Sequence, residues 1–185
     1  LDKTMFTFDS DALVSDNNFV TTGQDDFSIF EVSKINAVSN AVFGYYHLTD
    51  ESYIEMGTNA AGNYEVSVSD GTTTLLRKTA TVDTGKYHIA SLRKTSKYIY
   101  LDYYDSTSSV DLSSGNAAFI GTTSFEQDKF RIGCTQTTDG LIPPAAINTK
   151  YLDGDFQEVI IYDRKLTDAE TAKVVDYLNK KYKIY

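Results

Sequence analysis

The sequence predicts an all-β protein: an antiparallel sandwich of two sheets with a short C-terminal α-helix packed on it. Short runs rich in aromatic and β-branched residues recur along the 185 residues, and turn signals separate them at near-regular intervals. One run, 63–69, alternates strictly between apolar and polar residues. The last strand-like run leads directly into a helix start, and no earlier run does so. These features are typical of β-sandwiches.

Several segments have the composition expected of strands. They cover residues 5–8, 27–35, 41–48, 63–69, 72–77, 87–93, 98–104, 117–123, 129–134 and 155–162. Segment 105–116 is a loop rich in Ser and Asp, and 135–149 contains both prolines, which do not fit a central strand. A loop as long as 135–149 is uncommon and often functional, with a rim loop as the structural alternative.

Two pairs of strands are predicted to form hairpins. In 63–69 the apolar residues Tyr64, Val66 and Val68 share one face, which predicts an antiparallel strand whose other face is exposed to solvent. Asp70-Gly71 follows directly, and Asp-Gly between strand-like runs is a strong hairpin signal because a type I′ turn needs positive φ. Segments 87–93 and 98–104 form the second hairpin, which turns at Thr95-Ser96.

The stretch 151–170, YLDGDFQEVIIYDRKLTDAE, contains the strand that closes the fold. A strand that is apolar on both faces must be covered on both, so we expect a central or helix-covered strand. In a regular strand one face would carry Phe156, Ile160 and Tyr162, and the other Val159 and Ile161.

A helix is predicted over 167–182. Thr167 and Glu170 have the spacing of a capping box, in which each side chain accepts a hydrogen bond from the other residue's amide. Lysines cluster near the C-terminal end, where the helix dipole favours cations. One apolar stripe is expected to lie on the sandwich, on the outer face of strand 156–162. Its members are Ala172, Val175, Leu178 and Tyr182.

The amino-acid composition limits the classes of protein to which this chain can belong. Hydrophobic residues make up 41% and charged residues 23% of the chain, which indicates a globular protein. We find no repeat or linker, so we expect a single domain over 1–185, with the sandwich at 5–163 and the helix at 167–182. The net charge of −9 argues against nucleic acid as a partner, and no apolar run is long enough for membrane insertion. Because the chain starts at Leu1, we expect a processed product or an excised domain.

Three motifs resemble the laminin-G-like jelly rolls of the concanavalin A-like lectin/glucanase superfamily. The closing stretch GDFQEVIIYDRKLTDAE with its short helix is similar to the end of that family's domains. Segments 86–93 and 98–102 resemble its hairpin of an aromatic-His-apolar-Ala strand and a Tyr-apolar-Asp strand, and 130–133 also matches. The resemblance spans about 6–182 and implies a two-sheet jelly roll. It specifies an activity poorly, because lectins, adhesion modules, glycosidases and assembly domains share this fold.

Catalysis is the first function to weigh. Glycosidases of this fold carry a Glu-x-Asp-x-x-Glu pattern on one strand, and this chain has Asp153-x-Asp155-x-x-Glu158. The shorter Asp in first place would sit too far from the sugar, the pattern falls on the closing strand, and Trp is absent. A solvated acidic turn is the default interpretation. We therefore expect no enzyme activity and no catalytic residues, with a glycoside hydrolase as a remote alternative.

Nucleophilic and metal chemistry have few candidate residues. The only histidines are His47 and His88, no nucleophile elbow is present, and His88 is interpreted as a structural histidine. Two histidines and one cysteine do not make a recognisable zinc site. Asp16-Asn17-Asn18 and Asp25-Asp26 offer the oxygen ligands that Ca²⁺ prefers, but no spacing assigns them. We expect no required cofactor, and a structural Ca²⁺ stays an open alternative without named ligands.

Tyrosines carry the binding hypothesis. In 98–104 the aliphatics Ile99 and Leu101 alternate with Tyr98, Tyr100, Asp102 and Tyr104, which would line the outer side of one strand. Aromatic faces stack on sugar C–H faces and a carboxylate accepts from hydroxyls, so these four residues are the candidate ligand-binding set. Tyr45, Tyr46 and His47 could extend it. The alternative is that the tyrosines cover an exposed face of the sheet, or pack against the terminal helix or another subunit.

The sequence therefore favours a non-catalytic recognition module. We expect lectin-like binding of a carbohydrate or cell-surface receptor by a protein on an extracellular or virion (phage) surface. The alternative is a structural decoration or assembly domain that contacts other virion or surface proteins, as an oligomer, without binding sugar.

Overall fold

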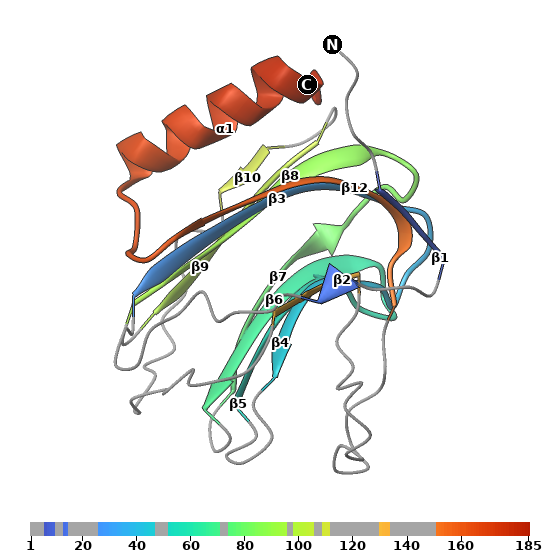
Figure 1. Cartoon of the computed structure of the whole chain (residues 1–185), viewed down its shortest axis with the longest axis horizontal. Helices are drawn as coiled ribbons and strands as arrows, with labels where there is room; N and C mark the ends of the chain where they lie inside the picture. Colours follow the sequence, from blue (N-terminus) through green and yellow to red (C-terminus); the bar gives the residue numbers. More distant parts are fainter. Residues whose placement is uncertain are drawn as a thin grey trace.

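The described residues form a sandwich of two antiparallel sheets with a helix outside it. The structure, a computed structural model, describes residues 6–9, 13–14, 26–46, 52–70, 74–95, 98–105, 109–111, 130–133 and 151–185. Sheet A arches over sheet B, and helix α1 (Asp168–Tyr182) lies on the outer face of sheet A (Figure 1). The predicted fold class, an all-β sandwich closed by a C-terminal helix, is confirmed.

Within the described residues each sheet has six strands, and strands that follow one another in the chain often lie in different sheets. Sheet A contains, in spatial order, β1 (Phe6–Asp9), β12 (Asp153–Tyr162), β3 (Phe27–Ile35), β8 (Tyr87–Lys94), β9 (Ile99–Tyr104) and β10 (Ser109–Asp111). Sheet B contains β2 (Leu13–Val14), β11 (Phe130–Ile132), β4 (Ala41–Tyr46), β5 (Ser52–Thr58), β6 (Asn63–Asp70) and β7 (Thr74–Thr81).

Both predicted hairpins form. Strand β6 pairs with β7, and β8 pairs with β9 through Lys94 opposite Ile99. The amide of Thr95 donates to the carbonyl of Tyr98 at 2.8 Å and closes the second hairpin. Strands β2, β5 and β10 were not predicted. In β5, Glu55 and Gly57 interrupt the apolar residues, so its composition does not read as a strand. The strand predicted over 117–123 and the loop 135–149 lie outside the described residues.

The main core lies between the sheets. The inner face of β6 carries Tyr64, Val66 and Val68, all fully buried, as the alternation predicts. The expectation that the opposite face is wet is wrong for Ser67 and Ser69, which are also buried. Alternation therefore identifies the face that enters the core, but it does not identify an open surface.

Strand β12 is covered on both faces, but a bulge changes its side-chain pattern. The pairing register with β3 shifts between Phe156 and Glu158. Phe156 consequently packs in the inner core with Val159, whereas Ile160 packs against the helix. The predicted grouping of Phe156 with Ile160 is wrong, because one extra residue in a strand reverses the alternation beyond it.

The helix docks on sheet A through a second apolar cluster. The capping box is present: the Thr167 hydroxyl accepts from the Glu170 amide, and the Glu170 carboxylate accepts from the Thr167 amide. Of the predicted stripe, Val175 and Leu178 are buried, whereas Ala172 is exposed. The buried face of the helix is rotated toward Thr171 and Val174. The cluster consists of Phe30, Val32, Ile89, Leu166, Val174, Val175, Leu178 and Ile184.

Candidate functional site

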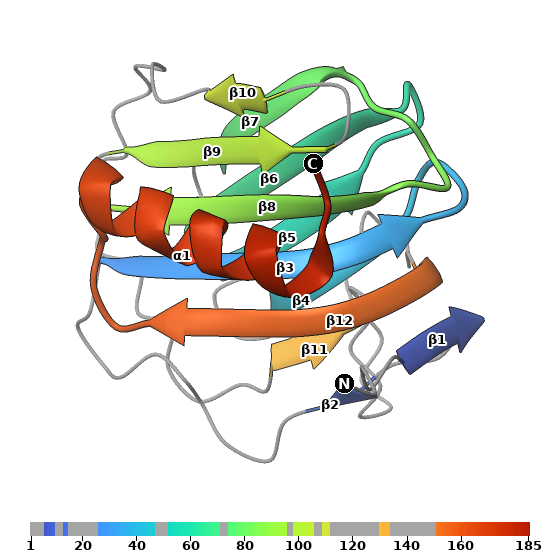
Figure 2. The ribbon, with the colours of Figure 1, turned by 90° about the horizontal axis from the view of Figure 1, so that it is seen from above.

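The outer side of β9 is the surface that the sequence identifies as a binding site. Inward-facing Ile99 and Leu101 are buried in the core between the sheets. Tyr98, immediately before β9, is 37% exposed, and Tyr100 is half-buried. Figure 2 shows that α1 starts beside the beginning of β9 and then runs across β8 and β3, so much of β9 is not covered by the helix. The aliphatic face points inward as predicted.

Asp102 lies on this outer side but is only 2% exposed. Its carboxylate accepts from the Ser91 hydroxyl at 2.6 Å and from Arg93 Nε at 3.1 Å. Arg93 Nη2 donates to the second carboxylate oxygen at 3.3 Å. The alternation of 98–104 predicts that this carboxylate faces an open surface, whereas in the structure it binds a buried guanidinium. A role of Asp102 in ligand binding stays a prediction.

Arg93 connects β9 to the start of the helix. Its Nη1 donates to Asp168 Oδ1 at 2.6 Å, and the hydrogen bond from Arg93 is the main cause that lowers the pKa of Asp168. Burial opposes the charge of Arg93, but its hydrogen bonds and charge interactions with Asp168 and Asp102 raise the pKa of the guanidinium overall. The helix N-terminus is thereby fixed to the hairpin that carries Tyr98 and Tyr100.

Two cations, each from a different element, lie near the ring of Tyr100. The Arg93 guanidinium lies 5.3 Å from the ring centroid, and the Lys165 ammonium, from the β12–α1 connection, lies 4.6 Å from it. Both distances allow cation–π attraction. Arg93 was not singled out in the sequence, although its place in β8 directly after the apolar residue Leu92 is compatible with a buried cation that needs partners.

Tyr104, at the other end of β9, is covered by the C-terminal tail. Its ring stacks on that of Tyr185 with centroids 5.9 Å apart and planes 25° apart. Asn179 holds the tail, because its side-chain oxygen accepts from the amides of Ile184 and Tyr185, each at 3.0 Å. The structure thus separates the four predicted residues into exposed Tyr98, half-buried Tyr100, buried Asp102 and tail-covered Tyr104.

The carboxylates with glycosidase-like spacing are held by different partners. Asp155 Oδ2 binds Lys34 Nζ at 2.5 Å and accepts from the Tyr87 hydroxyl at 3.1 Å. The hydrogen bond from Lys34 to Asp155 is the main cause that raises the pKa of Lys34. Burial is the main cause that raises the pKa of Tyr87. Glu158, beyond the bulge, instead pairs with Lys181 of the helix at 3.1 Å.

His88 has the structural environment that the sequence predicts. It is buried between the sheets, where its Nε2 lies 2.9 Å from Glu31 Oε1 and 3.2 Å from the Ser33 hydroxyl. The Tyr64 hydroxyl of sheet B donates to the same Glu31 oxygen at 2.7 Å. Burial, followed by the nearby Glu31 charge, raises the pKa of Tyr64 well above its usual value. These residues join the two sheets through polar contacts inside the core.

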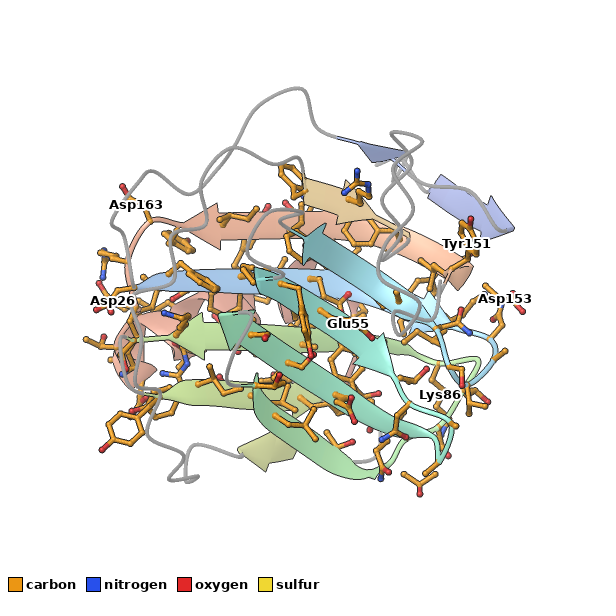
Figure 3. The ribbon with its side chains drawn as sticks, turned by 90° about the horizontal axis from the view of Figure 1, so that it is seen from below. Asp26, Glu55, Lys86, Tyr151, Asp153 and Asp163 are labelled. Carbon is orange, nitrogen blue, oxygen red and sulfur yellow. The ribbon has the colours of Figure 1, made fainter. Side chains whose placement is uncertain are left out.

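The described residues contain no group of three or more His, Cys, Asp or Glu side chains that could hold a metal ion. His47 and the acidic candidates Asp16-Asn17-Asn18 and Asp25 lie outside the described residues. Asp26 is exposed just before β3, and Glu55 lies on the outer face of sheet B (Figure 3). Within the described ranges no helix is both long and apolar enough to cross a membrane.

Comparisons with known proteins identify the fold. No family model and no curated protein matches the sequence. The LG1–3 region of the laminin α2 chain matches 92% of this chain and 33% of that chain, at 16% identity and a TM-score of 0.65. The CBM40 of the Ruminococcus gnavus IT-sialidase, bound to α2,3-sialyllactose, matches 88% and 97% of the two chains, at 12% identity and a TM-score of 0.57.

A third similar structure is the enzymatically active domain of bacteriophage CBA120 tailspike protein 2. It matches 95% of this chain and 27% of that chain, at 11% identity and a TM-score of 0.58. This chain therefore spans about a third of the laminin chain and less of the tailspike chain. At such identities the likeness concerns the fold. With its two antiparallel sheets and C-terminal helix, this chain has a laminin-G-like jelly-roll fold.

Proposed function

We propose that this chain is a non-catalytic recognition module, which binds a glycan or a cell-surface receptor on an extracellular or virion surface. The observation that carries the proposal is the pair Tyr98 and Tyr100, which remains accessible beside the start of the helix. Two residues along an extended chain are about 7 Å apart, a spacing at which both rings can contact one sugar chain. Aromatic rings with hydroxyl tips suit such a ligand.

The four candidate residues of segment 98–104 have different tasks. Tyr98 and Tyr100 contact the ligand, and Asp102 positions Tyr100 through Arg93, which lies 5.3 Å from its ring. Tyr104 contributes only together with Tyr185, which stacks on it. Because the spacing of these groups is set by the hairpin and helix, the surface is preorganised and loses little entropy on binding.

The absence of catalysis is part of the proposal. A retaining glycosidase needs two carboxyl groups about 5 Å apart around the scissile bond, and an inverting one needs them somewhat farther apart. Here the carboxylates that follow the glycosidase-like spacing engage separate cations: Asp155 binds Lys34, and Glu158 binds Lys181. Releasing either would leave a lysine without its partner, which favours a structural role for both.

A glycan array probed with the 185-residue chain tests the proposal. We expect binding that falls at least tenfold in Tyr98→Ala/Tyr100→Ala, since truncating an aromatic residue that dominates a binding surface typically costs about 2 kcal/mol or more. Tyr177→Ala, which removes an exposed tyrosine from the helix, is the matched control and should bind normally. Asp102 is unsuitable as a probe, because its substitution would also remove one of the two carboxylates that hold Arg93.

Two outcomes would contradict the proposal. If no glycan or cell surface binds and the chain forms an ordered multimer in light scattering, it is an assembly domain of a particle or surface protein. If a polysaccharide is hydrolysed and the activity disappears in Glu158→Gln, the chain is a glycoside hydrolase.

A further inference from the structure

The β12–α1 connection places a lysine beside Tyr100. Figure 2 shows this connection running past the ends of β3 and β8 toward the start of β9, where the helix begins. Lys165 is half-buried there, with its ammonium 4.6 Å from the Tyr100 ring centroid. Among the described residues no hydrogen bond or ion pair involves its side chain. The ammonium is thus available for a direct contact with an anion, although the protein has a net charge of −9.

The backbone on both sides of Lys165 is fixed by one buried side chain. The Ser28 hydroxyl donates to the carbonyl of Arg164 at 2.9 Å and accepts from the amide of Leu166 at 2.9 Å. Leu166 is buried in the cluster beneath the helix, and Arg164 pairs with Glu170 at 2.7 Å. The residues that flank Lys165 are therefore held on two sides, and the ammonium is presented from a defined position.

The Lys165 ammonium makes no direct contact with the carboxylates around it. Arg93 is bound to both Asp102 and Asp168, and with Lys165 these four groups sum to zero charge. The hydrogen bond from Arg93 is the main cause that lowers the pKa of Asp168, and Lys165 adds to it only through its charge. An anion on a ligand can instead contact the Lys165 ammonium directly, through a charge-assisted hydrogen bond.

We propose that Tyr98, Tyr100 and Lys165 form a subsite for an acidic sugar, whose ring packs on the tyrosines and whose anionic group binds the Lys165 ammonium. This inference rests on the proposed function and deepens it by naming the ligand class. Lysine is a point charge with three rotatable donors, so carboxylated and sulfated sugars share the chemistry it recognises.

The test uses two sets of probes, each built on one sugar core. Affinities of the 185-residue chain are measured by calorimetry for lactose, 3′-sialyllactose and 3′-sulfolactose, and for trigalacturonate against its methyl ester. We expect the acidic members to bind more tightly than the neutral ones, and their affinity to fall with added salt. The carboxylated and sulfated arms report which anion is preferred.

Lys165→Gln removes the charge and keeps the stem. It should weaken binding of the acidic probes about tenfold to hundredfold, the range of a hydrogen bond to a charged group, and leave the neutral probes unchanged. Lys173→Gln, which changes an exposed lysine on the helix, is the matched control and should affect binding of neither class of probe. Unchanged circular dichroism and melting temperature in both variants would show that folding is not the cause.

The outcomes separate this inference from the function on which it rests. Equal affinity for acidic and neutral sugars, or acidic binding that survives in Lys165→Gln, would overturn the acidic subsite and leave a glycan-binding module. Binding to no glycan would overturn both.

Discussion

Arg93 on β8 donates to Asp168 in the first turn of α1 at 2.6 Å, although 75 positions separate the two residues. The same guanidinium holds Asp102 on β9, so one buried side chain fastens the helix start to the hairpin. Helix docking and the geometry of the candidate binding surface consequently depend on the same contact.

Arg93→Gln should destabilise the protein strongly. The substitution leaves the Asp102 carboxylate buried without a cation, which typically costs about 3–5 kcal/mol in the free energy of unfolding. Urea denaturation measures this loss. The Arg93→Gln/Asp102→Asn double variant should lose less than the sum of the single variants, and simple additivity would mean that the pair is not coupled. Arg164→Gln, an exposed arginine of the same region, should have a much smaller effect.

The capping box should make the free energy of unfolding depend on pH in the acidic range. Hydrogen bonds from Arg164, then from Thr167, lower the pKa of Glu170 from 4.5 to about 2. Because the folded-state pKa is lowered, the stabilisation is complete above pH 4.5 and is lost as the pH falls toward 2. The unfolding free energies of the native chain and of Glu170→Gln should therefore converge between these pH values. A difference that stays constant over this interval would contradict the assignment.

Tyr64→Phe should weaken the polar link between the sheets. It removes the hydroxyl that donates to Glu31 Oε1 at 2.7 Å, while Glu31 Oε2 already has no hydrogen-bond partner in the described structure. A buried carboxylate that loses a donor costs about 1–3 kcal/mol. Chemical denaturation should show this loss, and Tyr98→Phe, at an exposed position, should show none. Equal stability of the two variants would exclude a stabilising Tyr64–Glu31 hydrogen bond.

Ser28→Ala should loosen the connection that carries Lys165. The buried hydroxyl makes hydrogen bonds to both flanking backbone groups, and its loss should cost about 1–3 kcal/mol. Hydrogen exchange should accelerate at the Leu166 amide but not at the Thr171 amide, which donates to Thr167 inside the helix at 2.8 Å. If acidic probes bind, their affinity should also fall. An unchanged Leu166 amide would show that Ser28 does not hold this segment.

Local hydrogen bonds and the alternation of apolar and polar residues could be predicted from the sequence. The capping box needs only Thr167 and Glu170, three positions apart, and it forms as predicted. The buried face of β6 follows from alternation alone, because consecutive side chains of a strand point to opposite faces. The strand order, by contrast, depends on pairings such as Phe6 with Phe156 that no local pattern contains.

The candidate site shows where prediction from sequence stops. The alternation of 98–104 correctly identified which residues leave the core, but it did not reveal that Arg93 and Ser91 would enclose Asp102, or that Tyr185 would cover Tyr104. Lys165 was not singled out, because its neighbour Tyr100 lies 65 positions away in the chain.

The sequence by itself determined the sandwich class, the hairpins and the capped helix, because each depends on residues within a few positions of one another. Only the tertiary structure decided the bulge that turns Phe156 inward, and which outward residues of β9 remain accessible. The exposure of a side chain depends on what packs over it. Here the helix and the connection before it, which are distant in sequence, pack over part of the outer face of sheet A.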